Sequence, residues 1–139
     1  MFGPKMVGRA VSKQTALDVK RMMRSVVEKG GTGTKANLES YIVCGKTGTA
    51  QKINRKGTYA DKDYIASFVG FAPYENPQIA VLVVVDEPVT NHYGGTVAAP
   101  AFRRIVHETL NYLNVHPEKP SKKPLYIIKK DSKEQDANG

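Results

Sequence analysis

The sequence predicts an α+β fold, in which helices cover an antiparallel sheet. Three segments rich in strand-forming residues lie between residues 41 and 86 and are separated by turn formers. Segments with helical periodicity precede and follow them, at residues 15–29 and 100–113. Strands joined by short turns pair antiparallel, and each amphipathic helix needs an apolar surface to cover. We therefore expect a helix, three antiparallel strands and a final helix.

The composition is that of one small globular unit. The chain has 139 residues, of which 40% are hydrophobic, enough for a single modest core. Its net charge of +8 includes no long block of like charges, which argues against a nucleic-acid-binding tail. The basic balance instead favours solubility and attraction to anionic substrates or to a membrane surface. No apolar run reaches the roughly 18 residues of a membrane span.

The first helix is predicted to have Thr15 as its N-cap, after an irregular start over residues 1–11. Thr15 and Asp18 have the spacing of a capping box, and two glycines from Gly30 end the helix. Its apolar positions, with two methionines expected to fill the core, are Val19, Met22, Met23, Val26 and Val27. The run GGTGTK at 30–35 follows a helix, whereas a phosphate-binding loop precedes one, so we predict a helix-terminating turn.

The three strands are predicted at residues 41–51, 64–71 and 79–86. Gly57 marks a hairpin turn between the first two, and residues 72–77 are dense in turn formers. The third strand is apolar without alternation, a pattern typical of a strand covered on both faces.

The last helix is predicted after a loop at residues 87–96, with Pro100 in its first turn, where proline is tolerated. Its apolar stripe is Phe102, Ile105, Val106, Thr109, Leu110 and Leu113. Residues 117–139 are rich in lysine and punctuated by proline, and we expect them to be mostly disordered. The patch at 126–128 could still add a strand or dock on the body.

The segment GKTGTAQ, residues 45–51, carries the clearest chemical signal. Side chains alternate along a strand, so Thr47 and Thr49 share one side, about 7 Å apart, while Lys46 and Gly48 share the other. Two hydroxyls beside an ammonium can hold a carboxylate. Gly48 removes a side chain where a ligand or another backbone comes close.

This segment has two other interpretations. Lys-Thr-Gly also occurs as an ordinary strand end. A phosphate loop is disfavoured because Ser40 stands where the first glycine of that motif is required, and because a strand leads directly into the motif.

Cys44 is expected to be a small buried hydrophobe, since a lone cysteine forms no internal disulfide and an apolar strand does not suit a catalytic thiol. One cysteine and three scattered histidines disfavour a zinc site, and no cofactor is expected.

The order and spacing of several segments resemble a known family. TALDVKRMMRSVVEKGGTGTKA, GKTGTAQ, YIASFVGFAP, NPQIAVLVVVDEP and YGGTVAAPAF closely resemble the C-terminal part of the transpeptidase domain of class B penicillin-binding proteins, the septal or elongation enzymes that cross-link peptidoglycan. The resemblance covers about residues 11–115 and implies that 12–116 belong to this domain. It also implies a five-stranded sheet whose other two strands come from earlier sequence.

The first two active-site motifs of that serine acyltransferase family, SxxK and SxN, are absent. No serine has a lysine three places on or an asparagine two places on: Ser12, Ser25, Ser40, Ser67, Ser121 and Ser132. The chain therefore lacks the family's nucleophile. We expect it to be the C-terminal piece of a serine D,D-transpeptidase and to be inactive alone, with a non-catalytic binding or scaffold module of the same fold as the alternative.

The resemblance implies roles for the third motif. The substrate would be a stem peptide ending in D-Ala-D-Ala, and Thr47 and Thr49 would bind its terminal carboxylate or that of a β-lactam. Lys46 would supply positive potential and bond the absent SxN serine, and the backbone N–H of Thr49 would serve the oxyanion hole. We expect Lys46, Thr47 and Thr49 to project into a groove along one sheet edge, with Gly48 lining it.

The loop residues Tyr93, Gly94 and Gly95 also match the family pattern. They could shape the cleft, although a surface turn is the favoured interpretation of Gly-Gly. His92 is expected to be a solvated loop histidine and not a general base.

Relatives of this kind imply a parent anchored in the bacterial inner membrane, with its catalytic domain facing the periplasm or cell exterior. This chain itself is expected to be soluble. Its partners would be the missing N-terminal part of the domain or, through the free edge of the third strand, a second copy in a strand-mediated dimer. Nucleic acid is disfavoured because no element interleaves basic and aromatic residues.

Overall fold

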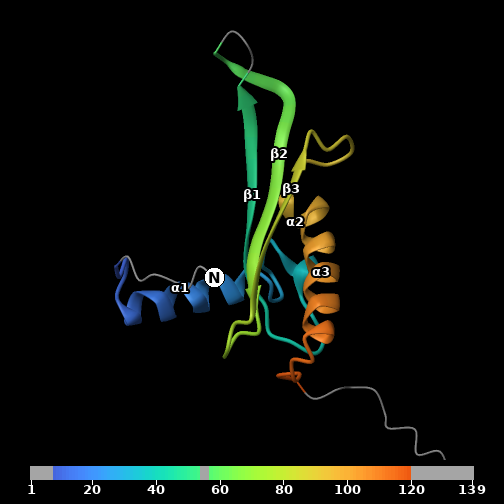
Figure 1. Ribbon diagram of the computed structural model, residues 1–139. Helices are drawn as coiled ribbons and strands as arrows, with labels where there is room; N and C mark the ends of the chain where they lie inside the picture. The colour runs from blue at the N-terminus through green and yellow to red at the C-terminus, as the bar shows by residue number, and fades with distance from the viewer. Residues whose placement is uncertain (1–7, 54–56, 120–139) are drawn as a thin grey trace, which may run out of the picture.

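The computed structural model describes residues 8–53 and 57–119 and confirms the predicted order of a helix, three strands and a helix (Figure 1). The elements are α1 (Lys13–Ser25), the 3-10 helix η1 (Thr34–Ala36), β1 (Cys44–Ile53), β2 (Tyr59–Ala72), β3 (Ile79–Asp86), α2 (Gly94–Val97) and α3 (Ala99–Tyr112). The short helices η1 and α2 were not predicted.

The strands form one antiparallel sheet in the order β1-β2-β3, as expected. β3 has the predicted bounds, whereas β2 begins earlier than predicted, at Tyr59. Gly57 has a φ of +78° in the connection between β1 and β2, a conformation that favours glycine. Both β1 and β3 are edge strands of the sheet that the described residues form.

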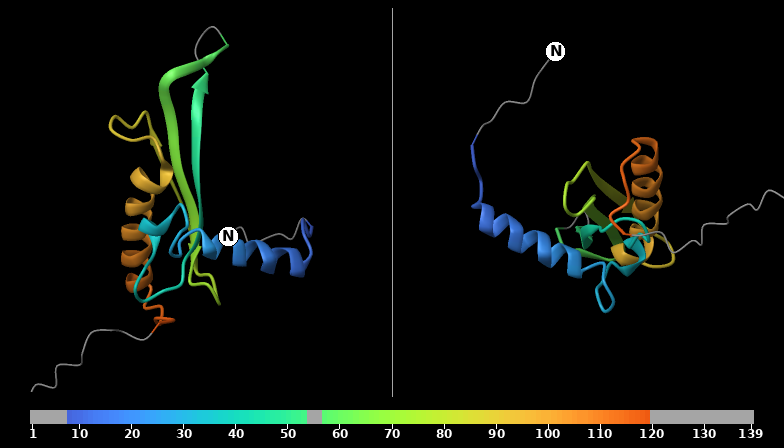
Figure 2. Two further views of the ribbon diagram at one scale, coloured as in Figure 1. Left: turned by 180° about the vertical axis from the view of Figure 1, so that it is seen from behind. Right: turned by 90° about the horizontal axis from the view of Figure 1, so that it is seen from below.

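The core lies between one face of the sheet and α3, which runs along the strands in both Figure 1 and Figure 2. The rings of Phe68 on β2 and Phe102 on α3 are 4.7 Å apart. The fully buried side chains of the predicted α3 stripe are Phe102, Val106 and Leu110. Ile105 and Leu113, which we also assigned to it, are 44% and 49% exposed.

The prediction that β3 is covered on both faces is wrong for this chain. Val81 and Val83 pack against the core, but Leu82 is 62% exposed and Val84 is 53% exposed. Val69 of β2 pairs with Leu82 and is also exposed. The reason is that α3 covers only one face, while α1 projects away from one end of the strands (Figures 1 and 2).

Two predictions for α1 are also corrected. Its N-cap is Ser12, whose Oγ accepts a hydrogen bond of 3.0 Å from the Thr15 N–H, so the helix starts earlier than expected. Asp18 does not close a capping box; it accepts from the Gln14 side chain and pairs with Arg21. Met22 is 65% exposed rather than buried, because α1 points its outer turns away from the sheet.

The glycine-rich run after α1 forms turns, although α1 ends at Ser25 and not at Gly30 as predicted. Gly30 has a φ of +91°, and the Gly33 N–H donates to the Val26 carbonyl at 2.8 Å. Residues 41–43, in contrast, are not part of a strand, since β1 begins at Cys44. The Ile42 N–H donates to the Glu118 carboxylate at 2.7 Å, which replaces the partner that a neighbouring strand would supply.

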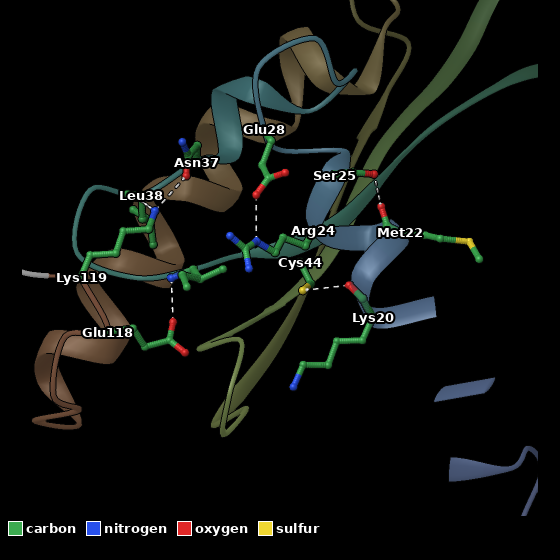
Figure 3. A network of polar contacts seen from close by, with 11 residues as sticks. Lys20, Met22, Arg24, Ser25, Glu28, Asn37, Leu38, Cys44, Glu118 and Lys119 are labelled. Carbon is green, nitrogen blue, oxygen red and sulfur yellow. Dashed lines mark hydrogen bonds and ion pairs between the residues drawn. The ribbon is translucent and has the colours of Figure 1, made fainter. Parts of the chain in front are cut away.

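Residues 118 and 119 fasten the end of the described chain to the body (Figure 3). The Glu118 carboxylate accepts from the N–H groups of Ile42 and Glu75, at 2.7 and 2.8 Å. Lys119 donates from Nζ to the Leu38 carbonyl at 2.8 Å. Burial lowers the pKa of Lys119. The patch at 126–128 and the rest of the predicted disordered tail lie outside the described residues.

Candidate carboxylate-binding cleft on the edge strand

Thr47 and Thr49 line one cavity, as the alternation of side chains along β1 predicts. The cavity has a volume of about 350 Å³ and lies between β1, α2 and the turn before η1. Its lining residues are Thr32, Thr34, Lys35, Thr47, Thr49, Tyr93, Gly94, Gly95 and Thr96. The hydroxyl groups of the motif thus face a hollow beside an open sheet edge.

Each of the two hydroxyls is held by a different segment. Thr47 Oγ1 lies 3.0 Å from Thr32 Oγ1, and either group can be the donor. Thr49 Oγ1 accepts from the Gly94 N–H at 3.4 Å. Because a hydroxyl carries one proton and two lone pairs, Thr49 keeps its proton available for an anionic acceptor in the cavity.

Gly94 and Gly95 are required by close backbone approach, and not by an ordinary surface turn as the sequence favoured. A Cβ on Gly94 would lie 2.0 Å from the Ser67 carbonyl oxygen and 2.6 Å from that of Gly48. A Cβ on Gly95 would lie 2.0 Å from the Thr32 carbonyl oxygen. The predicted loop at 87–96 therefore ends early, since α2 begins at Gly94 and packs across β1 and β2. At Gly48 the close neighbour is a side chain and not a backbone, since a Cβ there would lie 2.4 Å from Ser67 Oγ.

Lys46 and Gly48, which we expected in the same groove, do not line this cavity. The alternation that brings the threonines together places both of them on the opposite face of β1. Lys46 is exposed there, and its Nζ donates to the neighbouring Thr47 carbonyl at 2.9 Å. In the sheet it stands directly opposite Val69, on the face that α3 does not cover.

The cation that does line the cavity is Lys35, which the sequence analysis missed together with Thr32. Both belong to the run GGTGTK, interpreted only as a turn. The signal that could have identified them is the alternation of hydroxyl residues with glycines, which leaves the threonine side chains free to face a neighbouring strand. Sequence alone did not indicate which strand that is.

His92 and Tyr93 form an aromatic group at the edge of the cleft. The His92 ring stacks on Tyr64 at a centroid distance of 4.3 Å and meets Tyr93 at 4.4 Å. His92 is therefore partly buried by aromatic rings and is less solvated than predicted. Tyr93 remains largely exposed while it lines the cavity.

Cys44 is buried, as predicted, and lies just before the motif. Burial raises the pKa of its thiol to about 11, and Sγ donates to the Lys20 carbonyl at 3.4 Å. A thiol in this state is a poor nucleophile near neutral pH. Across residues 8–53 and 57–119, no three His, Cys, Asp or Glu side chains gather as metal ligands, and no helix is long and apolar enough to cross a membrane.

The family model of the penicillin binding protein transpeptidase domain matches residues 3–107. The chain belongs to this transpeptidase family. It is 46% identical to the probable peptidoglycan D,D-transpeptidase PenA of Neisseria meningitidis over 113 residues, and 42% identical to the peptidoglycan D,D-transpeptidase FtsI of Buchnera aphidicola over 108. These relatives confirm the class B resemblance seen in the sequence.

Solved structures of penicillin-binding proteins have the same fold. The transpeptidase domain of Burkholderia pseudomallei penicillin-binding protein 3 has 48% identity and a TM-score of 0.73, over 81% of this chain and 34% of that one. Penicillin-binding protein 3 of Mycobacterium tuberculosis, complexed with ampicillin, has 38% identity and a TM-score of 0.70, over 82% of this chain and 27% of that one. The match to PenA covers 81% of this chain but only 19% of the length of PenA.

Proposed function

We propose that this chain is the C-terminal part of a peptidoglycan D,D-transpeptidase, and that its cleft binds the terminal carboxylate of a stem peptide ending in D-Ala-D-Ala, or that of a β-lactam. The observation that carries the proposal is the pair of hydroxyls on β1, Thr47 and Thr49, facing one cavity in a chain of this family. Residues 12–116 would form the domain part, after an irregular start at 1–11 and before a tail at 117–139.

The polar groups of the cleft suit a carboxylate. Thr49 has a proton to donate, since Gly94 already supplies its accepted bond, and Lys35 adds positive charge to the cavity wall. A hydrogen bond to a charged group is worth about 1.5 to 3 kcal/mol. The Thr49 backbone N–H would donate to the oxyanion, together with the N–H of a nucleophile that lies outside this chain.

The uncovered sheet face indicates that another part of the protein completes this site. Lys46 lies on it, opposite Val69, with exposed Leu82 and Val84 beyond. A strand face this apolar needs cover, and β3 also has a free edge. We assign the cover to the N-terminal part of the same domain, which would bring the SxxK serine and place the SxN serine within reach of Lys46. Without that part, pairing of β3 between two copies is the competing outcome.

Labelling with a fluorescent penicillin tests the proposal. This chain alone should form no covalent adduct, whereas the parent with its N-terminal part restored should acylate. Thr47→Val and Thr49→Val in the parent should each slow acylation by about tenfold or more, the loss of one charge-assisted bond. The matched control is Thr109→Val on α3, which does not line the cleft.

Two outcomes would overturn it. A stable acyl adduct on a serine of the isolated chain, seen by intact-mass spectrometry, would contradict its assignment as an incomplete enzyme. A parent that never acylates would favour the alternative that the absent SxxK motif keeps open, a non-catalytic binding or scaffold module of the same fold. For the parent protein, the proposal includes an anchor in the inner membrane and a catalytic domain that faces the periplasm or cell exterior.

A further inference from the structure

A second and larger cavity lies between α3 and the segment around η1. Its volume is about 650 Å³. The lining residues are Lys35, Leu38, Glu39, Ser40, Pro100, Arg103, Arg104 and His107. Figure 1 shows the two segments side by side, with α3 running past η1. Lys35 lines both this basic cavity and the carboxylate cleft, while the other lining residues of the two differ.

Among the charged residues of the lining, Lys35, Arg103 and Arg104 outnumber the one carboxylate. Lys35 and Arg103 come from different segments, and neither has an ion-pair or hydrogen-bond partner in the part of the chain that the structure describes. Arg104 is paired with Glu108, at 2.9 Å from Nε to Oε1. Glu39 is the single carboxylate of the lining. Two unpaired cations facing one hollow repel each other and favour an anion between them.

We propose that this basic cavity binds a small phosphate monoester. The two unpaired cations match the charge of a phosphate monoester, which is about −1.5 to −2 near neutral pH. A single carboxylate carries only one negative charge. A guanidinium presents several N–H donors in a fork that fits phosphate oxygens. Leu38 and Pro100 give the cavity apolar surface for the body of the ester, and the volume falls within the range of about 300 to 1,000 Å³ found for small-molecule sites.

The site can be tested by titrating the ¹⁵N-labelled 139-residue chain with phenyl phosphate, inorganic phosphate and benzoate. Phenyl phosphate should give saturable shifts at the amides of Glu39, Arg103 and His107, with weaker effects from inorganic phosphate and weakest from benzoate. Arg103→Gln should weaken the binding of phenyl phosphate by about tenfold, as expected for the loss of one charge-assisted bond. Glu39→Gln should tighten the binding of phenyl phosphate, because it removes a negative charge from the lining. Lys13→Gln on α1 removes the same charge away from the cavity and should change nothing.

Each other result counts against the proposal. Equal weakening by Arg103→Gln and Lys13→Gln would mean diffuse attraction to a basic chain, and benzoate binding as tightly as phenyl phosphate would remove the phosphate assignment. Lack of saturation at these amides would remove the site. Vesicles containing phosphatidic acid separate the two sources of the ester. If the chain binds these vesicles and Arg103→Gln abolishes that binding, the ester is a lipid headgroup. If the chain binds phenyl phosphate but not the vesicles, the ester is a soluble molecule.

Discussion

At the scale of single residues, Gly94 is the position where the cleft tolerates least change. A methyl group at Gly94 would lie 2.0 Å from the Ser67 carbonyl oxygen, so α2 must move away from the sheet. We expect Gly94→Ala to lower the free energy of unfolding by about 1 to 3 kcal/mol, as for overpacking, and to break the bond from Gly94 to Thr49. Urea denaturation measures the loss. Gly8→Ala is the control, because nothing lies within 4 Å of a Cβ at Gly8, and equal effects of the two variants would contradict the argument.

Cys44 gives a second prediction at this scale. Its folded-state pKa, about 11, lies above the 9.0 of an unburied thiol. A raised pKa means that the contribution to stability is complete below pH 9 and is lost as the pH rises toward 11, because the unfolded thiol ionises first. Near neutral pH the folded chain should react slowly with iodoacetamide, and urea should restore the reaction. Since this is the only cysteine, mass spectrometry reads it directly, and fast alkylation of the folded chain would be inconsistent with burial.

At the scale of elements, the attachment of residues 118 and 119 replaces a strand pairing. Glu118→Ala would leave the N–H groups of Ile42 and Glu75 without their acceptor. We expect a loss of about 2 kcal/mol in the free energy of unfolding and faster hydrogen exchange at the Ile42 amide. Glu75→Ala is the matched control, since it removes a carboxylate but keeps the backbone N–H. If both variants exchange alike at Ile42, the carboxylate of Glu118 does not hold this segment.

Elements were predictable where their signal is local. The bounds of β3 follow from a continuous apolar run after a cluster of turn formers, and the buried positions of α3 follow from helical periodicity. The shared side of Thr47 and Thr49 follows from the alternation of a strand. Residues 41–43 were mispredicted because the acceptor for Ile42 lies 76 positions along the chain. Thr32 was missed for the same reason, since its contact with Thr47 spans 15 positions and exists only after the sheet has formed. The N-cap is Ser12 and not Thr15 because two cap-forming residues three positions apart compete locally.

At the scale of the whole molecule, one face of the sheet decides how the chain behaves alone. Val69, Leu82 and Val84 form an exposed apolar strip on the face that α3 does not cover, beside the free edge of β3. Contiguous apolar surface of this kind drives association, and an open strand edge directs it. A small core on the other face leaves little margin to offset that attraction.

The isolated chain should therefore self-associate, and Leu82→Lys should shift it toward monomer in sedimentation velocity. The side chain is already 62% exposed, so a charge at this position costs the fold little while it opposes burial of the strip. Val89→Lys is the control, because Val89 is 99% exposed in the loop after β3 and outside the strip. A wild-type chain that stays monomeric at every concentration would contradict the prediction. In the parent the same substitution should be harmful. If the N-terminal part of the domain covers this face, Leu82→Lys buries a charge there and should reduce both assembly of the domain and penicillin labelling. Val89→Lys should leave both unchanged.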